Sequence, residues 1–419
     1  MLRAGGREDT AWPIKHVVII IKENRTFDHL FGTFPGADGV TVGMSNGQPI
    51  PLYPAVDVVN VRDLPHHWWD GKKDINNGAM DGFARDNPLI TRFAYSQFRQ
   101  DQLPNYWHWA KEFVLSDYFF ASHAGPSFPN HLYLIAAQAG GALDTPLGAR
   151  EPPGRAKTWG CDAPEGQSIV VVDHEGEKVK VPTCFDFQTE GDLLTDAGIG
   201  WSYYAATETQ NGYIWSSYSA IKHIRETDEW VKHIRPVDDV IEDIAADRLP
   251  AVTWITPKFP FSEHPIKRTN FCHGENWTTG VVNAIMESPM WKDTAIFITW
   301  DDWGGFYDHV PPPGLDEFGL GIRVPLLTIS PYAKKGYIDS NLGEFSSILR
   351  FIEDNHGLGQ LTHRDRDADN LSYNFDFDQR PRPPDPLPLR VCSTPTPQED
   401  PRDLVMPPPT PSPSATPAD

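Results

Sequence analysis

The sequence predicts an α/β fold, with a mainly parallel central sheet flanked by helices on both faces. Short apolar runs rich in β-branched residues alternate with stretches of helical spacing, an order typical of parallel sheets with crossover helices. The chain has 419 residues, 39% of them hydrophobic, and can therefore bury a large core. Oxygen-bearing side chains also follow two of the apolar runs, as expected at the carboxyl edge of an open α/β sheet, where ligands bind.

The predicted strands are apolar runs that each lie close to Gly, Pro, Asp or Asn. Their ranges are 16–21, 113–120, 199–205, 251–256, 295–300 and 324–330. The predicted helices have apolar residues at helical spacing. Their ranges are 130–139, 237–246, 278–286 and 345–355. Because most of these helices lie between strands, we expect one sheet covered by helices.

The pattern indicates one large domain, residues 12–375, with two insertions that decorate or cover the site. The first insertion, near residues 40–110, is rich in Gly, Pro, Asn and aromatic residues and has little periodicity. The second, near residues 145–195, has two β-type runs around a polar turn, which predicts a hairpin. Fourteen of the forty prolines fall in the last thirty-nine residues. Such a composition cannot pack a core, so residues 376–419 are expected to form a disordered tail.

The charge of the chain limits its partners. With 57 acidic and 36 basic side chains, the formal net charge is -21, which repels nucleic acid and anionic membranes at long range. A nucleic-acid partner is therefore not expected. No apolar run approaches the ~20 residues that a membrane-spanning helix needs. The chain as written also has no secretory signal, so we expect either a cytoplasmic protein or a start that lies upstream.

Four cysteines, at positions 161, 184, 272 and 392, have no short metal-ligand spacing. Cys161 and Cys184 flank the predicted hairpin, and their positions are equally consistent with a disulfide and with free thiols. Cys272 and Cys392 are predicted to be free.

Two of the predicted strands lead into oxygen donors. Glu23 and Asn24 come shortly after the first strand, and Asp301 with Asp302 comes directly after the fifth. Carboxylates and amide carbonyls are hard ligands that suit Mg²⁺, Ca²⁺, Mn²⁺ or, less specifically, Zn²⁺. The alternative is structural, with Glu23 and Asn24 capping a helix and the aspartates starting a turn. The presence of both motifs at strand ends favours a divalent metal site, but it does not determine which metal binds.

A candidate nucleophile lies in Gly125-Pro126-Ser127-Phe128-Pro129. Pro129 suits the first turn of a helix, which places Ser127 at the amide-rich end where phosphate oxygens can bind. An ordinary capping serine is the alternative. Since a serine hydroxyl needs a base or a metal for activation, the oxygen cluster would complete a site for phosphoryl transfer.

Phosphoryl transfer also needs a proton donor for the leaving oxygen, a role that histidine fills well. The candidates are His66, His67, His264 and His309. His264 follows the strand predicted at 251–256 and should reach the same sheet edge. His66 lies in the first insertion. His309 follows the aspartates, and its alternative role is to orient a metal ligand.

Six ordered motifs carry a family resemblance. They are Ile14-Lys15-His16-Val17-Val18 leading into Glu23-Asn24-Arg25-Thr26-Phe27-Asp28, Pro65-His66, Gly78-Ala79-Met80-Asp81-Gly82-Phe83, Gly125-Pro126-Ser127, Glu263-His264-Pro265 and Asp301-Asp302-Trp303-Gly304-Gly305-Phe306-Tyr307-Asp308-His309-Val310. At these residues the chain resembles the bacterial phosphoesterase family of phospholipases C and related acid phosphatases, within the alkaline-phosphatase-like superfamily. The resemblance covers roughly residues 14–357.

The resemblance implies that Ser127 attacks phosphorus and forms a phosphoseryl intermediate. His66 and His264 would contact the phosphate or protonate the leaving oxygen. The metal would be bound by Glu23, Asn24, Asp301 and Asp302, and also by Ser127. The substrate would be a small phosphate ester or a phospholipid head group.

Three functions follow as hypotheses. The first is a metal-dependent phosphoesterase that hydrolyses phosphate monoesters or diesters. Ser127 stands where several phospholipases of the family have threonine, which favours a phosphatase-like enzyme. The second is a dedicated phospholipase C for phosphatidylcholine-like lipids, whose quaternary ammonium could bind tryptophans near the motifs, unless these tryptophans only pack the insertions. The third is a non-catalytic metal-binding interaction module. Nothing in the sequence predicts an oligomeric state.

Overall fold

The structure is a computed structural model that describes residues 10–147, 156–267 and 269–392. Its central sheet consists of β1 (His16–Lys22), β6 (Val114–Ser116), β10 (Trp201–Ala205), β11 (Ile234–Pro236), β12 (Val252–Ile255), β13 (Thr294–Trp300), β14 (Leu326–Ile329) and β15 (Tyr337–Asp339). The strand order is β11-β10-β12-β1-β13-β14-β6-β15. Every strand runs parallel to its neighbours except β14, which is antiparallel to β13 and β6. The predicted α/β class with a mainly parallel sheet is confirmed.

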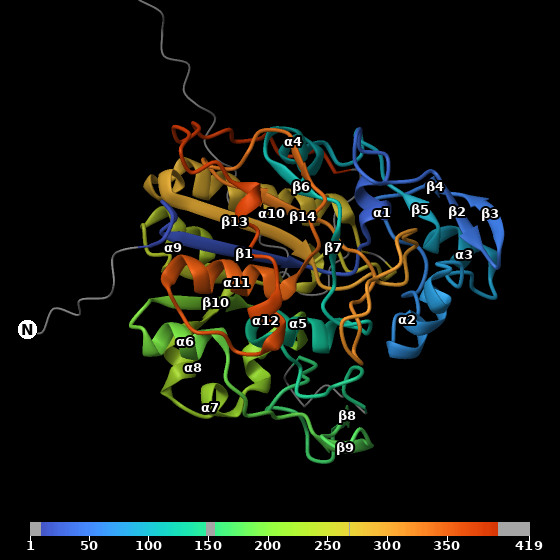
Figure 1. Cartoon of the computed structure of the whole chain (residues 1–419), viewed down its shortest axis with the longest axis horizontal. Coiled ribbons are helices and arrows are strands. Elements are labelled where there is room, and N and C mark those ends of the chain that lie inside the picture. Colours follow the sequence, from blue (N-terminus) through green and yellow to red (C-terminus); the bar gives the residue numbers. More distant parts are fainter. Residues whose placement is uncertain (1–9, 148–155, 268, 393–419) are drawn as a thin grey trace, which may run out of the picture.

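Helices cover both faces of this sheet (Figure 1). The α-helices are α1 (Phe27–Phe31), α2 (Trp68–Ile75), α3 (Pro88–Ala94), α4 (Pro104–Glu112), α5 (Ser127–Ala136), α6 (Glu190–Asp196), α7 (Lys222–Arg225), α8 (Asp228–His233), α9 (Val240–Ala245), α10 (Phe271–Glu287), α11 (Phe345–His356) and α12 (His363–Asp367). In β13, Phe297 packs on Phe351 of α11, whereas Trp300 packs on Tyr106 of α4. Side chains alternate along a strand, so residues three apart face opposite layers.

The two central strands, β1 and β13, are buried on both faces. Residues 17–21 and 295–298 are fully shielded from solvent, which explains why both strands read as continuous apolar runs rather than alternating ones. The strands pair from His16 with Thr294 to Lys22 with Trp300. Because they are parallel and end at the same level, the residues that follow them emerge side by side.

Local capping sets where the helices begin. Helix α10 begins at Phe271, earlier than the predicted 278, because Asn270 caps it by accepting a hydrogen bond from the Cys272 amide. Helix α5 begins at Ser127, three residues before the predicted start, with Pro129 in its first turn. The predicted helix at 237–246 is a 3-10 turn followed by α9.

The remaining elements are short and lie mainly in the insertions and connections. The strands are β2 (Val42–Ser45), β3 (Gln48–Pro51), β4 (Tyr53–Pro54), β5 (Ser96–Gln97), β7 (Phe119–Phe120), β8 (Ser168–Val172), β9 (Lys178–Pro182) and β16 (Gly343–Glu344). The 3-10 helices are η1 (Asn76–Gly78), η2 (Tyr213–Trp215), η3 (Ser217–Ala220), η4 (Val237–Asp239), η5 (Phe259–Phe261), η6 (Pro289–Asp293) and η7 (Ser372–Asn374). Strands β8 and β9 form the predicted antiparallel hairpin. The first insertion and this hairpin lie toward the end of the sheet to which β1 points (Figure 1).

The C-terminal segment differs from the prediction. Residues 376–392 were expected to be disordered, but they lie against α4 and α10. Asn105 and Asn283 donate hydrogen bonds to the carbonyls of Pro388 and Leu387, and Asn276 donates one to that of Arg390. An extended proline-rich chain can therefore be held by its backbone carbonyls, which its composition does not reveal. Residues 393–419 lie outside the described residues.

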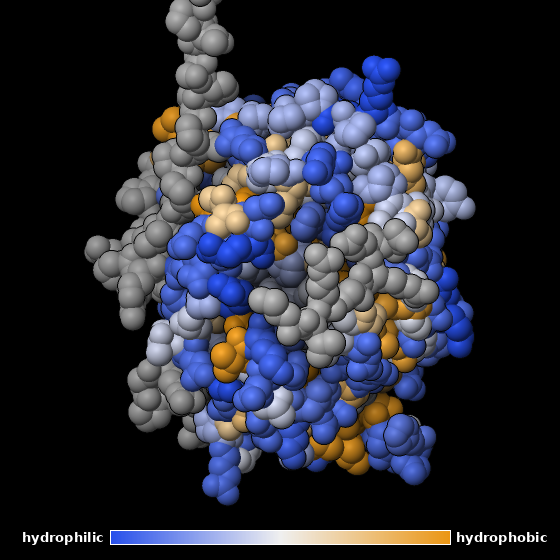
Figure 2. Space-filling view, turned by 90° about the vertical axis from the view of Figure 1, so that its left-hand side faces the viewer, coloured by the Kyte–Doolittle hydropathy of each residue, from blue (hydrophilic) through white to orange (hydrophobic). Residues whose placement is uncertain are grey.

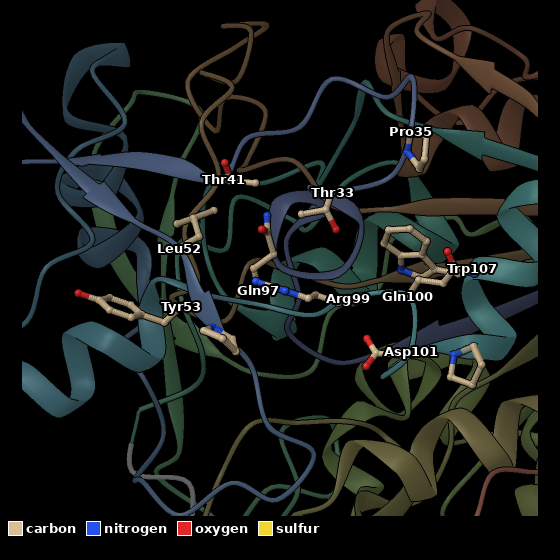
Figure 3. A pocket seen from close by; sticks show the side chains of 12 residues that line it. Thr33, Pro35, Thr41, Leu52, Tyr53, Gln97, Arg99, Gln100, Asp101 and Trp107 are labelled. Carbon is tan, nitrogen blue, oxygen red and sulfur yellow. The ribbon is translucent and has the colours of Figure 1, made fainter.

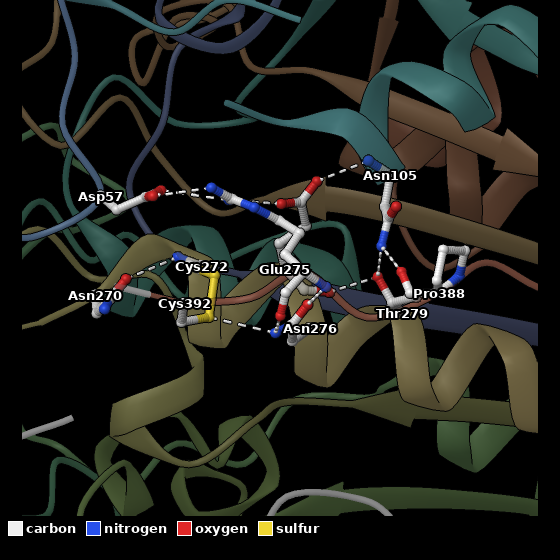
Figure 4. Close-up of a disulfide and its surroundings, with 10 residues drawn as sticks. Asp57, Asn105, Asn270, Cys272, Glu275, Asn276, Thr279, Pro388 and Cys392 are labelled. Carbon is white, nitrogen blue, oxygen red and sulfur yellow. Dashed lines mark hydrogen bonds and ion pairs between the residues drawn. A yellow bond between two sulfur atoms is a disulfide. The ribbon is translucent and has the colours of Figure 1, made fainter. Parts of the chain in front are cut away.

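All four cysteines form disulfides. Cys161 is joined to Cys184. Cys272 is joined to Cys392 (Figure 4), so the prediction that this second pair is free is wrong. The sequence separation of 120 between Cys272 and Cys392 hid this pairing, which arises because the C-terminal segment returns to the start of α10. Disulfides persist mainly in oxidising compartments.

The longer disulfide loop is expected to contribute more to stability. Replacing both Cys272 and Cys392 with serine should lower the free energy of unfolding by about 2–5 kcal/mol, because an open loop gives the unfolded chain more freedom. The double replacement of Cys161 and Cys184, which are only 23 residues apart, is the matched control and should cost less. Urea unfolding under non-reducing conditions measures both. A larger loss for the shorter loop would contradict this expectation.

Within the described residues, no helix combines the length and the apolar character that crossing a membrane requires. Figure 2 shows one face of the molecule, which is mostly hydrophilic with separate hydrophobic patches.

Candidate metal centre and nucleophile

Three segments that are far apart in the sequence meet at the carboxyl ends of β1 and β13. The backbone N–H of Asn24 donates a hydrogen bond of 2.8 Å to Asp301 Oδ1. The Ser127 hydroxyl lies 3.2 Å from Asp302 Oδ2 and 3.4 Å from Glu23 Oε2. All five residues are at most 2% exposed. The structure thus brings the predicted nucleophile next to Glu23 and Asp302 and groups it with the other two predicted ligands, Asn24 and Asp301.

The backbone around these residues is tightly constrained. Asn24 has a φ of 63°, and this left-handed residue turns the chain from β1 into α1, which Thr26 caps. Gly304 also has a positive φ, 57°, and a Cβ there would lie 2.5 Å from Asn24 Cβ. Only glycine therefore fits beside Asn24, which explains the glycine two residues after Asp302.

Several oxygen atoms of this centre face one another. The side-chain oxygen of Asn24 lies 3.1 Å from Glu23 Oε2 and 3.2 Å from Asp301 Oδ1. Exchanging the oxygen and nitrogen of this side-chain amide would replace these two repulsions with hydrogen bonds. Asp301 Oδ2 has no hydrogen-bond partner among the described residues. Burial and the nearby Asp301 charge raise the pKa values of Glu23 and Asp302 well above their usual range. This hard-oxygen donor set fits a divalent cation.

Sequence reasoning missed His131, which belongs to the same cluster. Its Nε2 lies 2.9 Å from Glu23 Oε1 and 3.6 Å from Asp301 Oδ2. Burial lowers its pKa, but the contact with Asp301 outweighs burial, so that the pKa is raised. His131 is four residues after Ser127 in α5, and residues at this spacing share one face of a helix. That spacing was the available signal.

His66 and His264 reach the cluster from two other loops. Their Nε2 atoms lie 3.1 and 3.4 Å from Asn24 Nδ2, and Asp63 lies 3.8 Å from each ring. Burial lowers the pKa of His66, but Asp63 and Asp302 raise it to about 9. Burial lowers the pKa of His264 to about 4. One imidazole therefore favours its charged form and the other its neutral form.

The structure does not bring His309 to this centre. Its Nδ1 lies 2.7 Å from Asp28 Oδ2, in a group where the buried Arg323 also pairs with Asp28 and Asp308. Gly304 and Gly305 both have positive φ and turn the chain between Asp302 and His309. His309 is therefore not placed to act on a ligand at Ser127. It pairs with an acidic side chain, as in its alternative role, but that side chain, Asp28, is not one of the predicted metal ligands.

A cavity of about 850 Å³ opens over Ser127 and both histidines. Its outer wall includes the aromatic side chains of Trp159, Trp215 and Phe259, and the cations Arg62 and Lys157. None of the tryptophans near the motifs, at positions 68, 69, 107, 109, 300 and 303, lines it. His67, the fourth histidine candidate, lines the cavity but pairs with Asp144.

A second hollow, of about 690 Å³, lies beside the first insertion (Figure 3). Gln97, Arg99 and Trp107 are among its lining residues, and none of the predicted site residues lines it. The cavity over Ser127 is therefore the candidate active site.

The fold and the site together define an α/β protein with a buried set of hard oxygen donors beside a serine hydroxyl. This chain belongs to the Phosphoesterase family, whose model matches residues 14–359. The expected family resemblance is confirmed.

The relatives and similar structures are distant. The chain is 26% identical over 398 residues to the non-hemolytic phospholipase C of Pseudomonas aeruginosa, covering 82% of this chain and 54% of the relative. It is 30% identical over 416 residues to the non-hemolytic phospholipase C of Burkholderia pseudomallei, covering 84% and 56%. The chain thus spans about half the length of these relatives. A phosphonate monoester hydrolase of Agrobacterium radiobacter has a TM-score of 0.39 at 11% identity, covering 86% of this chain and 77% of that structure.

Proposed function

We propose that this protein hydrolyses phosphate esters through Ser127, beside a divalent cation held by Glu23, Asn24, Asp301 and Asp302. The observation that carries the proposal is the buried set of acceptor oxygens with the Ser127 hydroxyl 3.2 to 3.4 Å from two of its carboxylates. A purely structural serine would have no reason to face such a set. Membership of the Phosphoesterase family supports the same chemistry.

The residues divide the reaction as follows. Ser127 Oγ forms a bond to phosphorus while the bond from phosphorus to the leaving oxygen breaks. The hydroxyl proton moves toward Asp302 Oδ2, its acceptor in this geometry. His66, whose pKa is raised to about 9, donates a proton to the leaving oxygen. The oxygen of a water then bonds to phosphorus and neutral His264 takes a proton from that water, while the bond from phosphorus to Ser127 Oγ breaks and Asp302 returns the proton to Oγ. A bound divalent cation would stabilise the serine alkoxide and the charge on the phosphate.

Two features of the cavity bear on the substrate. Arg62 and Lys157 line it, and neither forms an ion pair with any described residue, so both are available for a negatively charged ligand. This favours small phosphate monoesters. The second candidate is a phospholipase C. Two observations favour it: the relatives are named phospholipases C, and the aromatic side chains of the cavity offer a surface for a quaternary ammonium group.

A chelation experiment with two substrates tests both candidates. Removing divalent ions should lower kcat for p-nitrophenyl phosphate by about 10³-fold, since a catalytic cation supplies several kcal/mol. Adding back Ca²⁺, Mg²⁺, Mn²⁺ and Zn²⁺ in turn would identify the metal. p-Nitrophenyl phosphate should be a better substrate than p-nitrophenylphosphorylcholine.

The outcomes separate the hypotheses. Preference for the choline diester, with cleavage of phosphatidylcholine vesicles, would favour the phospholipase. Tight Mn²⁺ binding without hydrolysis of any substrate would favour a non-catalytic binding module. Hydrolysis that survives complete chelation would exclude the proposed metal role.

A further inference from the structure

One buried carboxylate beneath the candidate centre is bonded to three separate elements. Glu263 is 2% exposed. Its Oε1 accepts a hydrogen bond of 2.6 Å from the Tyr106 hydroxyl of α4 and lies 3.3 Å from Lys22 Nζ of β1. Its Oε2 accepts a hydrogen bond of 2.9 Å from Trp300 Nε1 of β13. Glu263 thus connects the two central strands to the helix layer.

The positions of these partners in the chain relate this contact to the centre. Lys22 directly precedes Glu23, and Trp300 directly precedes Asp301. Lys22 and Trp300 are also register partners at the ends of β1 and β13. Glu263 itself directly precedes His264. The Glu263 carboxylate therefore contacts the residues that directly precede two proposed metal ligands, Glu23 and Asp301. Glu263 is itself followed directly by the proposed proton acceptor, His264.

The surroundings of Glu263 are shaped around this contact. Its φ of 75° is left-handed, a conformation that costs about 1 kcal/mol or more for a residue other than glycine. A Cβ at Gly274 of α10 would lie 2.2 Å from Glu263 Cγ, so α10 leaves space for this side chain. The Gly274 carbonyl also accepts a hydrogen bond from Lys22 Nζ. Backbone strain and a fitted glycine together indicate that the position of the carboxylate matters.

Stability alone explains this arrangement poorly. Replacing a buried ion pair by apolar groups of similar size is often neutral or stabilising, because burying two charges is expensive. Lys22 and Glu263 both have fully buried side chains. The contact is better explained by the geometry that it imposes on the neighbouring residues.

We propose that Glu263 is a positioning residue that holds Glu23, Asp301 and His264 in mutual register. The proposal rests on the proposed function, because these three residues are its metal ligands and proton acceptor. Glu263 acts through Lys22 and Trp300 and does not itself touch the substrate.

Three variants test this role, with Mn²⁺ affinity measured by electron paramagnetic resonance in the full-length protein. Glu263→Gln should weaken Mn²⁺ binding about 10- to 100-fold, the usual loss when a supporting contact of a metal centre is removed. Glu263→Gln also leaves the buried Lys22 without its partner and should therefore lower Tm. Combining it with Lys22→Met removes that charge, so Tm should return toward the wild-type value while Mn²⁺ affinity stays low. Gly274→Ala displaces Glu263 without changing any charge and should also weaken Mn²⁺ binding. Gly314→Ala is the control, since a Cβ there meets nothing within 4 Å.

The results distinguish positioning from a structural role. In the variants, kcat for p-nitrophenyl phosphate should fall together with Mn²⁺ affinity, with little change in KM. If the double variant recovers Mn²⁺ affinity together with Tm, Glu263 is only structural and the proposal is overturned. Unchanged Mn²⁺ affinity in Gly274→Ala would also overturn it. Absence of hydrolysis by the wild type would refute the proposed function instead, while the Mn²⁺ measurement would still test Glu263.

Discussion

Replacing Ser127 with alanine is expected to lower kcat for p-nitrophenyl phosphate by about 10⁴-fold or more, the scale of loss seen when a nucleophile is removed. The hydroxyl is the only group of this residue that faces Glu23 and Asp302. Alanine keeps helix α5, which is buried along its whole length, so the fold should persist. Steady-state kinetics measures the loss, and an acid-quenched wild-type reaction should show a peptide containing Ser127 with one added phosphoryl group.

The matched control is Ser288→Ala. Ser288 caps η6 with its side chain, away from the cavity, so its loss should affect stability slightly and kcat not at all. The Mn²⁺ affinity of Ser127→Ala should fall far less than kcat, since the four other proposed oxygen ligands remain. A variant that keeps kcat within tenfold of the wild type would exclude Ser127 as the nucleophile.

A stability effect that grows with pH is expected from two buried glutamates that do not belong to the centre. Glu190 of α6 and Glu353 of α11 are both 0% exposed, and none of their carboxyl oxygens has a hydrogen-bond partner among the described residues. Burial raises the pKa of Glu190 well above its usual range. Burial and the neighbouring Asp365 raise the pKa of Glu353 to about 11. Burial therefore favours the neutral form of both carboxyl groups in the folded protein.

The direction of the pH effect follows from these raised pKa values. A carboxyl whose pKa is higher in the folded than in the unfolded protein contributes its full stability only below the unfolded value, about 4.5. This stability is lost progressively as pH rises toward the folded pKa. The isosteric replacements Glu190→Gln and Glu353→Gln carry no such penalty. They should leave Tm unchanged at pH 4.5 and raise it by about 2–5 °C at pH 9.

Differential scanning fluorimetry between pH 4.5 and 9 measures this effect. Glu175→Gln, at the exposed tip of the β8–β9 hairpin, is the control and should not change the slope of Tm with pH. A variant that shifts Tm equally at every pH would show that packing, and not ionisation, dominates at that residue.

Much of the centre was predictable because its signals are local. The residues of β1 and β13 are apolar on both faces, and oxygen donors follow each run, so the donors could be assigned to strand ends. Pro129 marked the first turn of α5 and placed Ser127 at its start. The signal for His131 was also local, but a histidine within a buried helix reads as packing until the carboxylates opposite it are known.

Other features depend on contacts between distant segments. Cys272 meets Cys392 only because the C-terminal segment returns across α10. His309 follows the aspartates closely in sequence, yet two left-handed glycines turn the chain so that His309 pairs with Asp28. Glu263 looks like an ordinary polar residue beside His264, and its three partners come from three other elements.

By itself, the sequence determined most strands of the central sheet, several of the helices and the chemical types of the site residues, because apolar periodicity, capping residues and donor groups act within a few positions. The tertiary structure alone decided which strand ends are neighbours, which histidines reach the oxygen cluster and which buried charges are paired. These outcomes depend on strand order and on packing between layers, and neither is encoded in any short stretch of the chain.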